Sequence, residues 1–196
     1  QALQFVDRSA VNSKYTIDRG TGIQLRHKDK VGNMVIKEAL AITMGEGKNY
    51  TSANLGGYEF TGRVEFLPFG EFTSKGDYFG SDLKREPEPK LAIGVTYDQN
   101  NNTYREAGFK GDFLAESRDQ NTVFIDAMFK SRGFSTMIEY ANKKTDGTAV
   151  VSDGAYQTGT GINVQAGYLF ANNFEVAGRY TAINPEDNNW SDDYVD

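Results

Sequence analysis

Apolar and polar residues alternate along much of the chain, and residues 57–67 show this pattern most clearly. Four aromatic or aliphatic side chains fall on one face and four polar side chains on the other: Tyr58, Phe60, Val64 and Phe66 against Glu59, Thr61, Arg63 and Glu65. Side chains of a β-strand point alternately to its two faces, so the pattern predicts a strand with one apolar and one polar face. The apolar face then lies against either a protein core or lipid.

The same alternation recurs and predicts about eight strands, with no segment of helical period. We expect these strands near residues 22–27, 34–44, 57–67, 91–98, 123–130, 134–140, 162–168 and 174–181. Residues 1–19 are expected to form a loop with a short helical turn, residues 77–83 a further helical turn, and Gln99–Asn102 a strand break. Residues 103–120 are the hardest to assign, with some extended character around Phe109 and Phe113. The chain is thus expected to be all-β, with residues 1–196 in one domain.

Connections between the expected strands alternate between short and long. Short polar turns are expected at Lys28–Asn33, Ser131–Gly133 and Phe170–Asn173, and long polar loops after Met44, Tyr97, Tyr140 and Tyr180. Transmembrane barrels have short periplasmic turns and longer outer loops, so this alternation favours lipid over a protein core. The long segment Pro68–Pro89 falls on the short-turn side and is the one exception.

Aromatic residues mark the expected strand ends. Tyrosines tend to lie at the long-loop ends and phenylalanines at the short-turn ends: Tyr58, Tyr97, Tyr140 and Tyr180 against Phe66, Phe129, Phe134 and Phe174. Tyr168 departs from this division. Two aromatic girdles are typical of the edges of a lipid-facing band, so the pattern predicts an antiparallel transmembrane β-barrel.

The composition narrows the class of protein further. The chain of 196 residues has a formal net charge of −6 and a mean hydropathy of −0.57. It lacks the ~20 consecutive apolar residues of a spanning helix, but a barrel strand needs apolar residues only at alternate positions. The acidic balance argues against nucleic-acid binding, and the absence of cysteine excludes disulfides and thiol chemistry. Because the sequence begins at Gln1 without a signal-peptide pattern, we expect a processed chain or an internal piece of a longer one.

Charged residues recur on the polar faces, which point into the expected barrel: Lys37, Glu59, Arg63, Glu65, Asp126, Lys130, Glu139, Glu175 and Arg179. Burying so many ions without solvent is costly, so these candidate pore-lining residues predict a water-filled lumen. A barrel of about eight strands is filled by its own side chains, whereas barrels of about 16 to 18 strands enclose water. The charges therefore imply more strands than this chain supplies. Cross-strand pairing in the barrel wall is the alternative role for each charge.

Several segments together resemble the phosphate-selective porin O and P family of outer-membrane porins: Phe5–Ser9, Asp18–Ile23, Gly62–Pro68, Pro89–Gly94 and Phe174–Tyr180. The resemblance implies a usually trimeric barrel of about 16 strands with an infolded loop that narrows the pore. This chain would be an incomplete part of that barrel, with flanking strands missing. Members of the family attract anions with arginine and lysine arrays in the lumen. Here the inward charges mix both signs, so the resemblance carries over the pore but not phosphate selectivity.

The first loop carries two further candidate pore-lining residues. Arg8 and Arg19 match positions near the family's constriction, so they either line it or are solvated loop charges. His27 is the only histidine, so a histidine metal cluster is excluded, and a Ser-His-Asp triad would have to use this residue beside a turn. The acidic tail Pro185–Asp193 lacks the EF-hand spacing, and Gly159–Gly161 opens no helix that could bind phosphate. We therefore expect no enzyme, no metal site and no cofactor.

The sequence as a whole predicts a Gram-negative outer-membrane porin for passive diffusion. Its expected partners are outer-membrane lipid and lipopolysaccharide, small hydrophilic solutes or ions, and further copies of itself in a trimer. A structural or docking barrel subunit that binds other envelope proteins is the alternative. A third possibility is a soluble β-sandwich or lipocalin-like binder whose apolar face forms the core.

Overall fold

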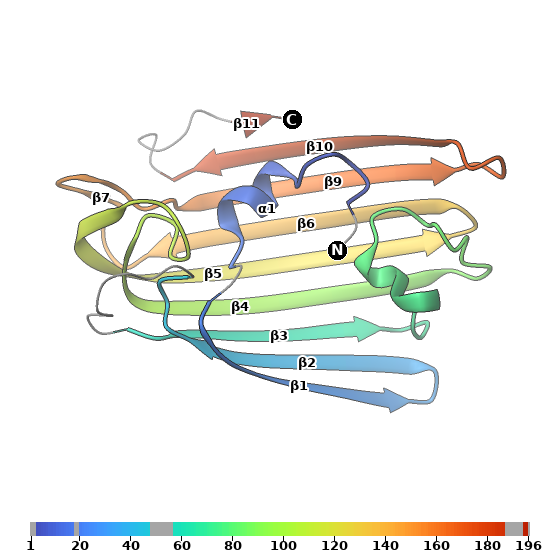
Figure 1. The fold of residues 1–196 in the computed structure, drawn as a ribbon, viewed down its shortest axis with the longest axis horizontal. Helices are drawn as coiled ribbons and strands as arrows, with labels where there is room; N and C mark the ends of the chain where they lie inside the picture. Colours follow the sequence, from blue (N-terminus) through green and yellow to red (C-terminus); the bar gives the residue numbers. More distant parts are fainter. Residues whose placement is uncertain (1–2, 18–19, 48–56, 187–193, 196) are drawn as a thin grey trace.

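The computed structural model describes residues 3–17, 20–47, 57–186 and 194–195 (Figure 1). Its strands are β1 (Gly22–Val31), β2 (Met34–Thr43), β3 (Glu59–Leu67), β4 (Lys90–Arg105), β5 (Phe113–Ser131), β6 (Phe134–Thr145), β7 (Val150–Val151), β8 (Gly154–Ala155), β9 (Gly159–Leu169), β10 (Glu175–Pro185) and β11 (Tyr194–Val195). The helical segments are α1 (Ala10–Tyr15) and the 3-10 segment η1 (Thr73–Tyr78). No helix within these described ranges is long and apolar enough to cross a membrane.

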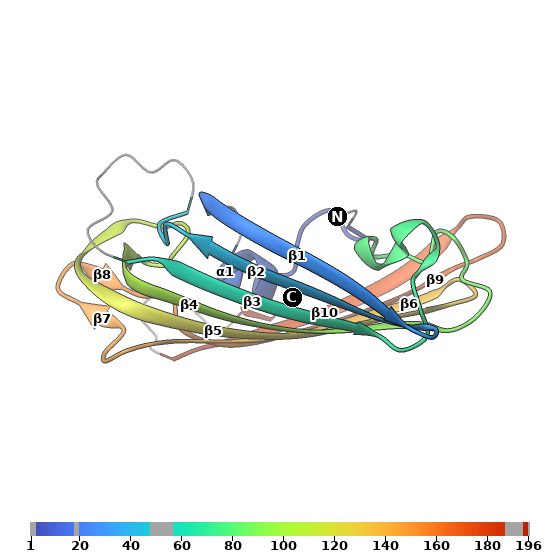
Figure 2. The ribbon, with the colours of Figure 1, turned by 90° about the horizontal axis from the view of Figure 1, so that it is seen from below.

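A single nine-stranded sheet contains all the long strands, in the order β1-β2-β3-β4-β5-β6-β9-β10-β11. Every neighbouring pair is antiparallel, and β7 and β8 form a separate small hairpin. The prediction of an antiparallel all-β fold is therefore confirmed. The sheet curves into a trough (Figure 2), with β1 and β11 as its edges. It is not closed on itself, so the closed barrel stays a prediction.

The concave face of the sheet is identified by the segment that lies on it. Helix α1 contacts β6, β9 and β10, and its Val11 and Tyr15 cluster with Ala141 and Ile183 of the sheet. Ala141 and Ile183 are both register partners of Gly161, so all three residues share this face. Their neighbours in sequence point to the opposite, convex face, because successive side chains of a strand alternate.

The two faces differ sharply in polarity. The convex face carries large apolar side chains that are exposed: Ile23, Leu25, Leu40, Ile42, Phe60, Val64, Ile93, Val95, Ile125, Ile138, Ile162 and Val176. The concave face carries polar side chains that are buried: Glu59, Thr96, Asp98, Thr122, Lys130, Ser135, Lys143, Asn163, Gln165 and Thr181. Water-soluble proteins bury their large apolar residues instead. The alternation seen in the sequence is thus confirmed, and its apolar side faces away from the protein.

Some expected element ends are wrong. The turn predicted at Lys28–Asn33 is limited to Gly32 and Asn33, because the lysines and aspartate before it continue β1. Gly32 takes a φ of 62°, which glycine adopts without the steric cost that a Cβ would bring. The helical turn expected at residues 77–83 forms earlier, as η1.

The outer halves of β4 and β5 were not predicted. Gln99–Asn102 does not end β4, which continues to Arg105 with a register shift after Asn100. β5 already begins at Phe113, so the two strands account for most of residues 103–120. Their outer ends pair through polar residues such as Thr103 and Arg118, which give no apolar alternation in the sequence.

Candidate functional site

Residues 3–17, here called the strap, lie across the concave face over β6, β9 and β10 (Figure 1). Ser9 caps α1, since its hydroxyl accepts a hydrogen bond from the backbone N–H three residues later at 3.2 Å. Val11 and Tyr15 on the helix are fully buried. A Cβ at Gly161 would lie 3.1 Å from the Tyr15 ring, so the glycine makes room for the strap on β9.

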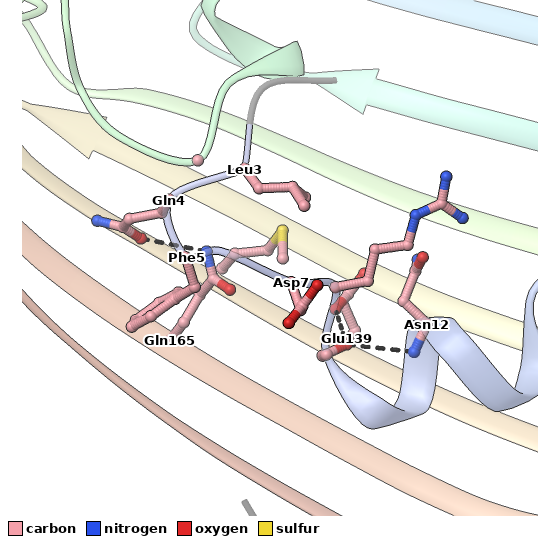
Figure 3. A pocket seen from close by; sticks show the side chains of 11 residues that line it. Leu3, Gln4, Phe5, Asp7, Asn12, Glu139 and Gln165 are labelled. Carbon is pink, nitrogen blue, oxygen red and sulfur yellow. Dashed lines mark hydrogen bonds between the residues drawn. The ribbon is translucent and has the colours of Figure 1, made fainter.

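Polar contacts also tie the strap to the sheet (Figure 3). The Gln4 amide donates to the Glu175 carboxylate at 2.6 Å and accepts a hydrogen bond from the Gln165 amide at 3.1 Å. The Ser9 hydroxyl donates to the Glu139 carboxylate at 3.2 Å. Two of the predicted pore-lining carboxylates therefore hold the strap in place.

Arg179 on β10 lies under the strap as well. Its guanidinium donates to the Asp7 carbonyl at 2.9 Å and lies 5.0 Å from the centroid of the Phe5 ring. Arg8 lines a small pocket between the strap and β6, together with Glu139 (Figure 3). The strap thus covers Arg179 and brings Arg8 to the concave side of the sheet.

A second segment, residues 68–89 and here called the collar, folds inward from the short-turn end of the sheet. The Lys130 ammonium on β5 donates to three of its carbonyls, those of Gly76, Phe79 and Ser81, each at 2.7 Å. The collar therefore packs on the concave face and is not a simple turn. This explains why its length broke the predicted alternation of short and long connections.

The strap and the collar meet over the sheet. A Cβ at Gly80 of the collar would lie 2.7 Å from the Cβ of Gln4 in the strap. The Ser81 hydroxyl donates at 2.8 Å to Glu175, whose carboxylate also accepts from Gln4. The two infolded segments therefore form a continuous cover on the β6, β9 and β10 side of the trough.

A hollow of about 820 Å³ remains on the other side of the trough, over β1 to β5 and part of β6. The strap borders it through Asn12, Thr16 and Ile17, and the collar through Asp77 and Tyr78. Several predicted pore-lining residues line its wall: Lys37, Glu59, Arg63, Glu65, Asp126 and Glu139.

Arg63 occupies the centre of this wall. Its guanidinium binds both carboxylate oxygens of Asp126, at 2.6 and 2.9 Å, and it also bonds Glu65 at 3.1 Å and the Thr96 hydroxyl at 3.0 Å. A Cβ at Gly94 would fall on the guanidinium, so the glycine lets Arg63 reach across β4. Bidentate pairing fixes the cation in one orientation.

A second ion cluster lies nearer the short turns. The Lys37 ammonium donates to Glu65 at 2.8 Å and to Asp77 of the collar at 2.5 Å. Lys28 forms an ion pair with Glu71 at the more exposed end of the collar. Both signs of charge therefore line the hollow, as the sequence suggested.

A buried polar layer lies at the long-loop end of the trough. The Lys143 ammonium donates at 2.5 Å to the Ala107 carbonyl in the loop between β4 and β5. Thr43 donates to Glu59, and Thr61 donates to Asp98 at 2.7 Å. These contacts connect the wall of the hollow to the outer loops.

The predicted pore-lining residues fall into two groups. Those that line the hollow are named above. Lys130 is covered by the collar, and Glu175 and Arg179 contact the strap or both infolded segments. Arg19 lies outside the described residues, as does most of the acidic tail that was weighed as a calcium site.

Sequence reasoning missed three charged residues of the hollow. Arg26 and Lys28 continue the inward positions of β1, and the alternation from Ile23 could have been extended to find them. Asp77 reaches the hollow only because the collar folds inward, and no local signal in the sequence indicates that.

The ionisable groups outside the strands that have shifted pKa values include Glu46 and Lys110, each in a loop at the long-loop end of the sheet. Burial raises the pKa of the Glu46 carboxyl in the loop after β2. Burial lowers the pKa of Lys110 in the loop after β4, and the nearby charges of Lys14 and Arg8 lower it further. The Lys110 ammonium donates to the Ser13 carbonyl at 2.6 Å, so this outer loop also contacts the strap.

His27 lies on the convex side of β1, where its Nδ1 is 3.1 Å from the Glu38 carboxylate. Glu38 is the register partner of Val64, so it is a charged residue on the convex face of β2. Within the described ranges, no group of three or more histidine, cysteine, aspartate or glutamate residues is placed to hold a metal ion.

Comparison with known proteins gives no match: no family model, curated protein or solved structure matches the chain. The resemblance to the porin O and P family therefore stays a prediction. We base the function on the geometry of the two faces of the sheet.

Proposed function

We propose that this chain forms part of the wall of an outer-membrane porin, a water-filled channel for passive diffusion of small hydrophilic solutes or ions. The observation that carries the proposal is the inverted polarity of the sheet, with exposed apolar side chains outside the curve and charged side chains inside it. Transmembrane barrels place apolar residues toward lipid and polar residues toward the lumen.

The size of the apolar face argues against a soluble protein. Soluble monomers rarely expose a contiguous apolar patch larger than a few hundred Å². Here exposed apolar side chains extend over the long strands, from Ile23 on β1 to Val176 on β10. Lipid covers such a band without any further protein layer, so the soluble β-sandwich or lipocalin-like interpretation is disfavoured.

The hollow supplies the inner surface of the proposed pore. A charged wall needs water, because an unsolvated ion in a protein interior costs several kcal/mol. Closure into a barrel of about 16 strands would place this wall around an aqueous lumen. By the resemblance to the porin O and P family, the strap then corresponds to the infolded loop that narrows the pore. We propose trimer formation on the basis of the same family resemblance.

The charges argue against a strongly anion-selective pore. Arg63 and Lys37 are each paired with two carboxylates, Arg63 with Asp126 and Glu65 and Lys37 with Glu65 and Asp77. Their positive charge is therefore largely compensated inside the hollow. We propose a general pore for small hydrophilic solutes in place of a phosphate-specific one.

Reconstitution of the purified full-length protein in a planar lipid bilayer tests the proposal. A porin gives stepwise increases of conductance and admits small hydrophilic solutes into liposomes. Stable insertion without conductance and without solute uptake would overturn it.

A docking role within a larger envelope assembly is the second candidate, and one observation favours it. His27 and Glu38 form a polar pair on the otherwise apolar convex face, where lipid contact is unfavourable. Protein contact at this point would satisfy the pair. Mass measurement of the complex extracted in mild detergent separates the porin proposal from the docking proposal. A complex that contains only copies of this chain favours the porin, and a complex with unrelated chains in a fixed ratio favours the docking role.

A further inference from the structure

We propose that the collar is a fixed constriction of the pore, in which Lys130 is the positioning residue and Asp77 supplies a charge that favours cations. The inference rests on the proposed porin function and adds a determinant of its selectivity. It concerns the end of the hollow opposite the long loops.

Lys130 holds the middle of the collar. Its side chain is only 1 % exposed, and its ammonium donates to the carbonyls of Gly76, Phe79 and Ser81. An ammonium has three donors, so these three contacts use all of them. Removing the charge would leave three buried carbonyls without this partner, and the collar would lose its anchor on β5.

Asp82 and Glu86 hold the end of the collar that leads to β4. The Asp82 carboxylate accepts hydrogen bonds from the backbone N–H of Gly133 at 2.8 Å and of Glu86 at 3.1 Å. The Glu86 carbonyl accepts from the Arg132 N–H at 2.8 Å, and its carboxylate accepts from the Thr73 N–H at 2.6 Å. The turn between β5 and β6 is therefore bonded directly to the collar.

An apolar contact holds the start of the collar. Phe72 is buried in a cluster with Val35, Leu67 and Ala92 of the neighbouring strands. The chain then passes through Ser74 and Lys75, which take φ values of 53° and 59°. Two consecutive residues with a side chain rarely adopt this left-handed conformation unless surrounding contacts impose it. The collar is thus held in one shape from several sides.

This fixed shape brings Asp77 to the hollow. Its side chain is 7 % exposed and its carboxylate lies 2.5 Å from the Lys37 ammonium, which also binds Glu65. Glu65 also binds Arg63, which pairs with Asp126, so these two cations and two carboxylates together have no net charge. With Asp77, the cluster carries one net negative charge at the short-turn end of the hollow.

A fixed negative charge beside an aqueous path attracts cations and repels anions. In water, removal of one negative charge at a separation of about 8 Å lowers the local cation concentration by about twofold and raises the local anion concentration by about twofold. Asp77→Asn is therefore expected to lower the cation-to-anion permeability ratio by about fourfold. Glu88→Gln removes the same charge from an exposed position in the collar that does not line the hollow, and it is expected to leave the ratio unchanged.

The test measures reversal potentials of the full-length protein and its variants in a potassium chloride gradient. If wild type gives no channels, the proposed function itself fails. If wild type conducts and Asp77→Asn has the same permeability ratio as wild type, the function stands and the role of Asp77 is overturned. An equal shift in Glu88→Gln would also overturn it.

Lys130→Met tests the positioning role in the same recordings. Loss of its own positive charge raises the ratio in either background, whereas release of Asp77 lowers the ratio only where Asp77 is present. The shift caused by Lys130→Met is therefore expected to be more toward anions in the wild-type background than in the Asp77→Asn background. Lys130→Arg keeps a cationic donor and is expected to restore part of the wild-type ratio. Equal shifts of the ratio in the two backgrounds would overturn the anchoring role of Lys130. If Lys130→Met fails to assemble, the comparison of Asp77→Asn with Glu88→Gln still tests the role of Asp77.

Discussion

The Arg63 guanidinium binds both carboxylate oxygens of Asp126, although the two residues lie on β3 and β5 with β4 between them. Gly94 on β4 is the register partner of Asp126, and it leaves the space through which the guanidinium passes. The ion pair in the middle of the hollow thus depends on the absence of a side chain on the intervening strand.

Gly94→Ala is expected to push the Arg63 guanidinium away from Asp126 and toward the hollow. Single-channel conductance should fall, because the displaced side chain narrows the water-filled space. The unfolding free energy should change by only about 1 kcal/mol or less, since both side chains are partly exposed. Gly178→Ala is the matched control, because a Cβ there meets no atom within 4 Å. Equal conductance of the two variants would contradict this account.

Val64→Arg tests the assignment of the convex face to lipid. Val64 is 52 % exposed, so an arginine there would cost little in a protein surrounded by water. Near the middle of a bilayer it should lower the unfolding free energy by ~2 to 4 kcal/mol. Ala41→Arg places the same side chain in the hollow and should cost less. Urea titration in lipid vesicles measures the unfolding free energy of both variants. An equal loss in Val64→Arg and Ala41→Arg would argue against a lipid-facing Val64.

Tyr15→Ala is expected to loosen the strap. Tyr15 is fully buried against Val11, Ala141 and Ile183, so its truncation should cost roughly 3 kcal/mol. A loosened strap should also increase conductance noise in bilayer recordings. Val6→Ala removes an exposed apolar side chain from the same strap and should change neither quantity. If Tyr15→Ala has the same unfolding free energy and the same conductance noise as wild type, the burial of Tyr15 does not hold the strap on the sheet.

Glu46→Gln is expected to alter the pH dependence of stability. Burial raises the pKa of Glu46 in the folded protein. The stability that protonated Glu46 contributes is therefore fully present below the ordinary glutamate pKa of about 4.3 and is lost as pH rises through the raised value. Glutamine cannot ionise, so the variant should gain stability relative to wild type between pH 4 and pH 8. Thermal unfolding in detergent at both pH values measures this difference. A relative loss at pH 8 would show that the ionised carboxylate is stabilising.

Much of the fold could be predicted from the sequence, because the middle part of each long strand carries its own alternation of apolar and polar residues. The pattern placed Val64 and Arg63 on opposite faces. Toward its long-loop end β4 loses the alternation, because consecutive polar residues from Gln99 to Asn102 point to both faces. The extension of β4 to Arg105 was missed for that reason.

The candidate site was predictable only in part. Inward direction follows from local alternation, which is why Lys37 and Asp126 could be assigned to the wall of the hollow. Coverage by infolded segments depends on contacts distant in sequence, such as Lys130 with Gly76 and Arg179 with Asp7. No local pattern separates an inward lysine that meets water from one that binds a folded segment.

The most direct test of the central claim uses the absence of cysteine in the chain. Single cysteines are introduced as Ala41→Cys in the wall of the hollow and Val64→Cys on the convex face, and the full-length protein is reconstituted in liposomes. We expect a water-soluble, membrane-impermeant thiol reagent to label Ala41→Cys rapidly and Val64→Cys hardly at all. Rapid labelling of Val64→Cys together with protection of Ala41→Cys would contradict a lipid-facing convex side and a water-filled hollow.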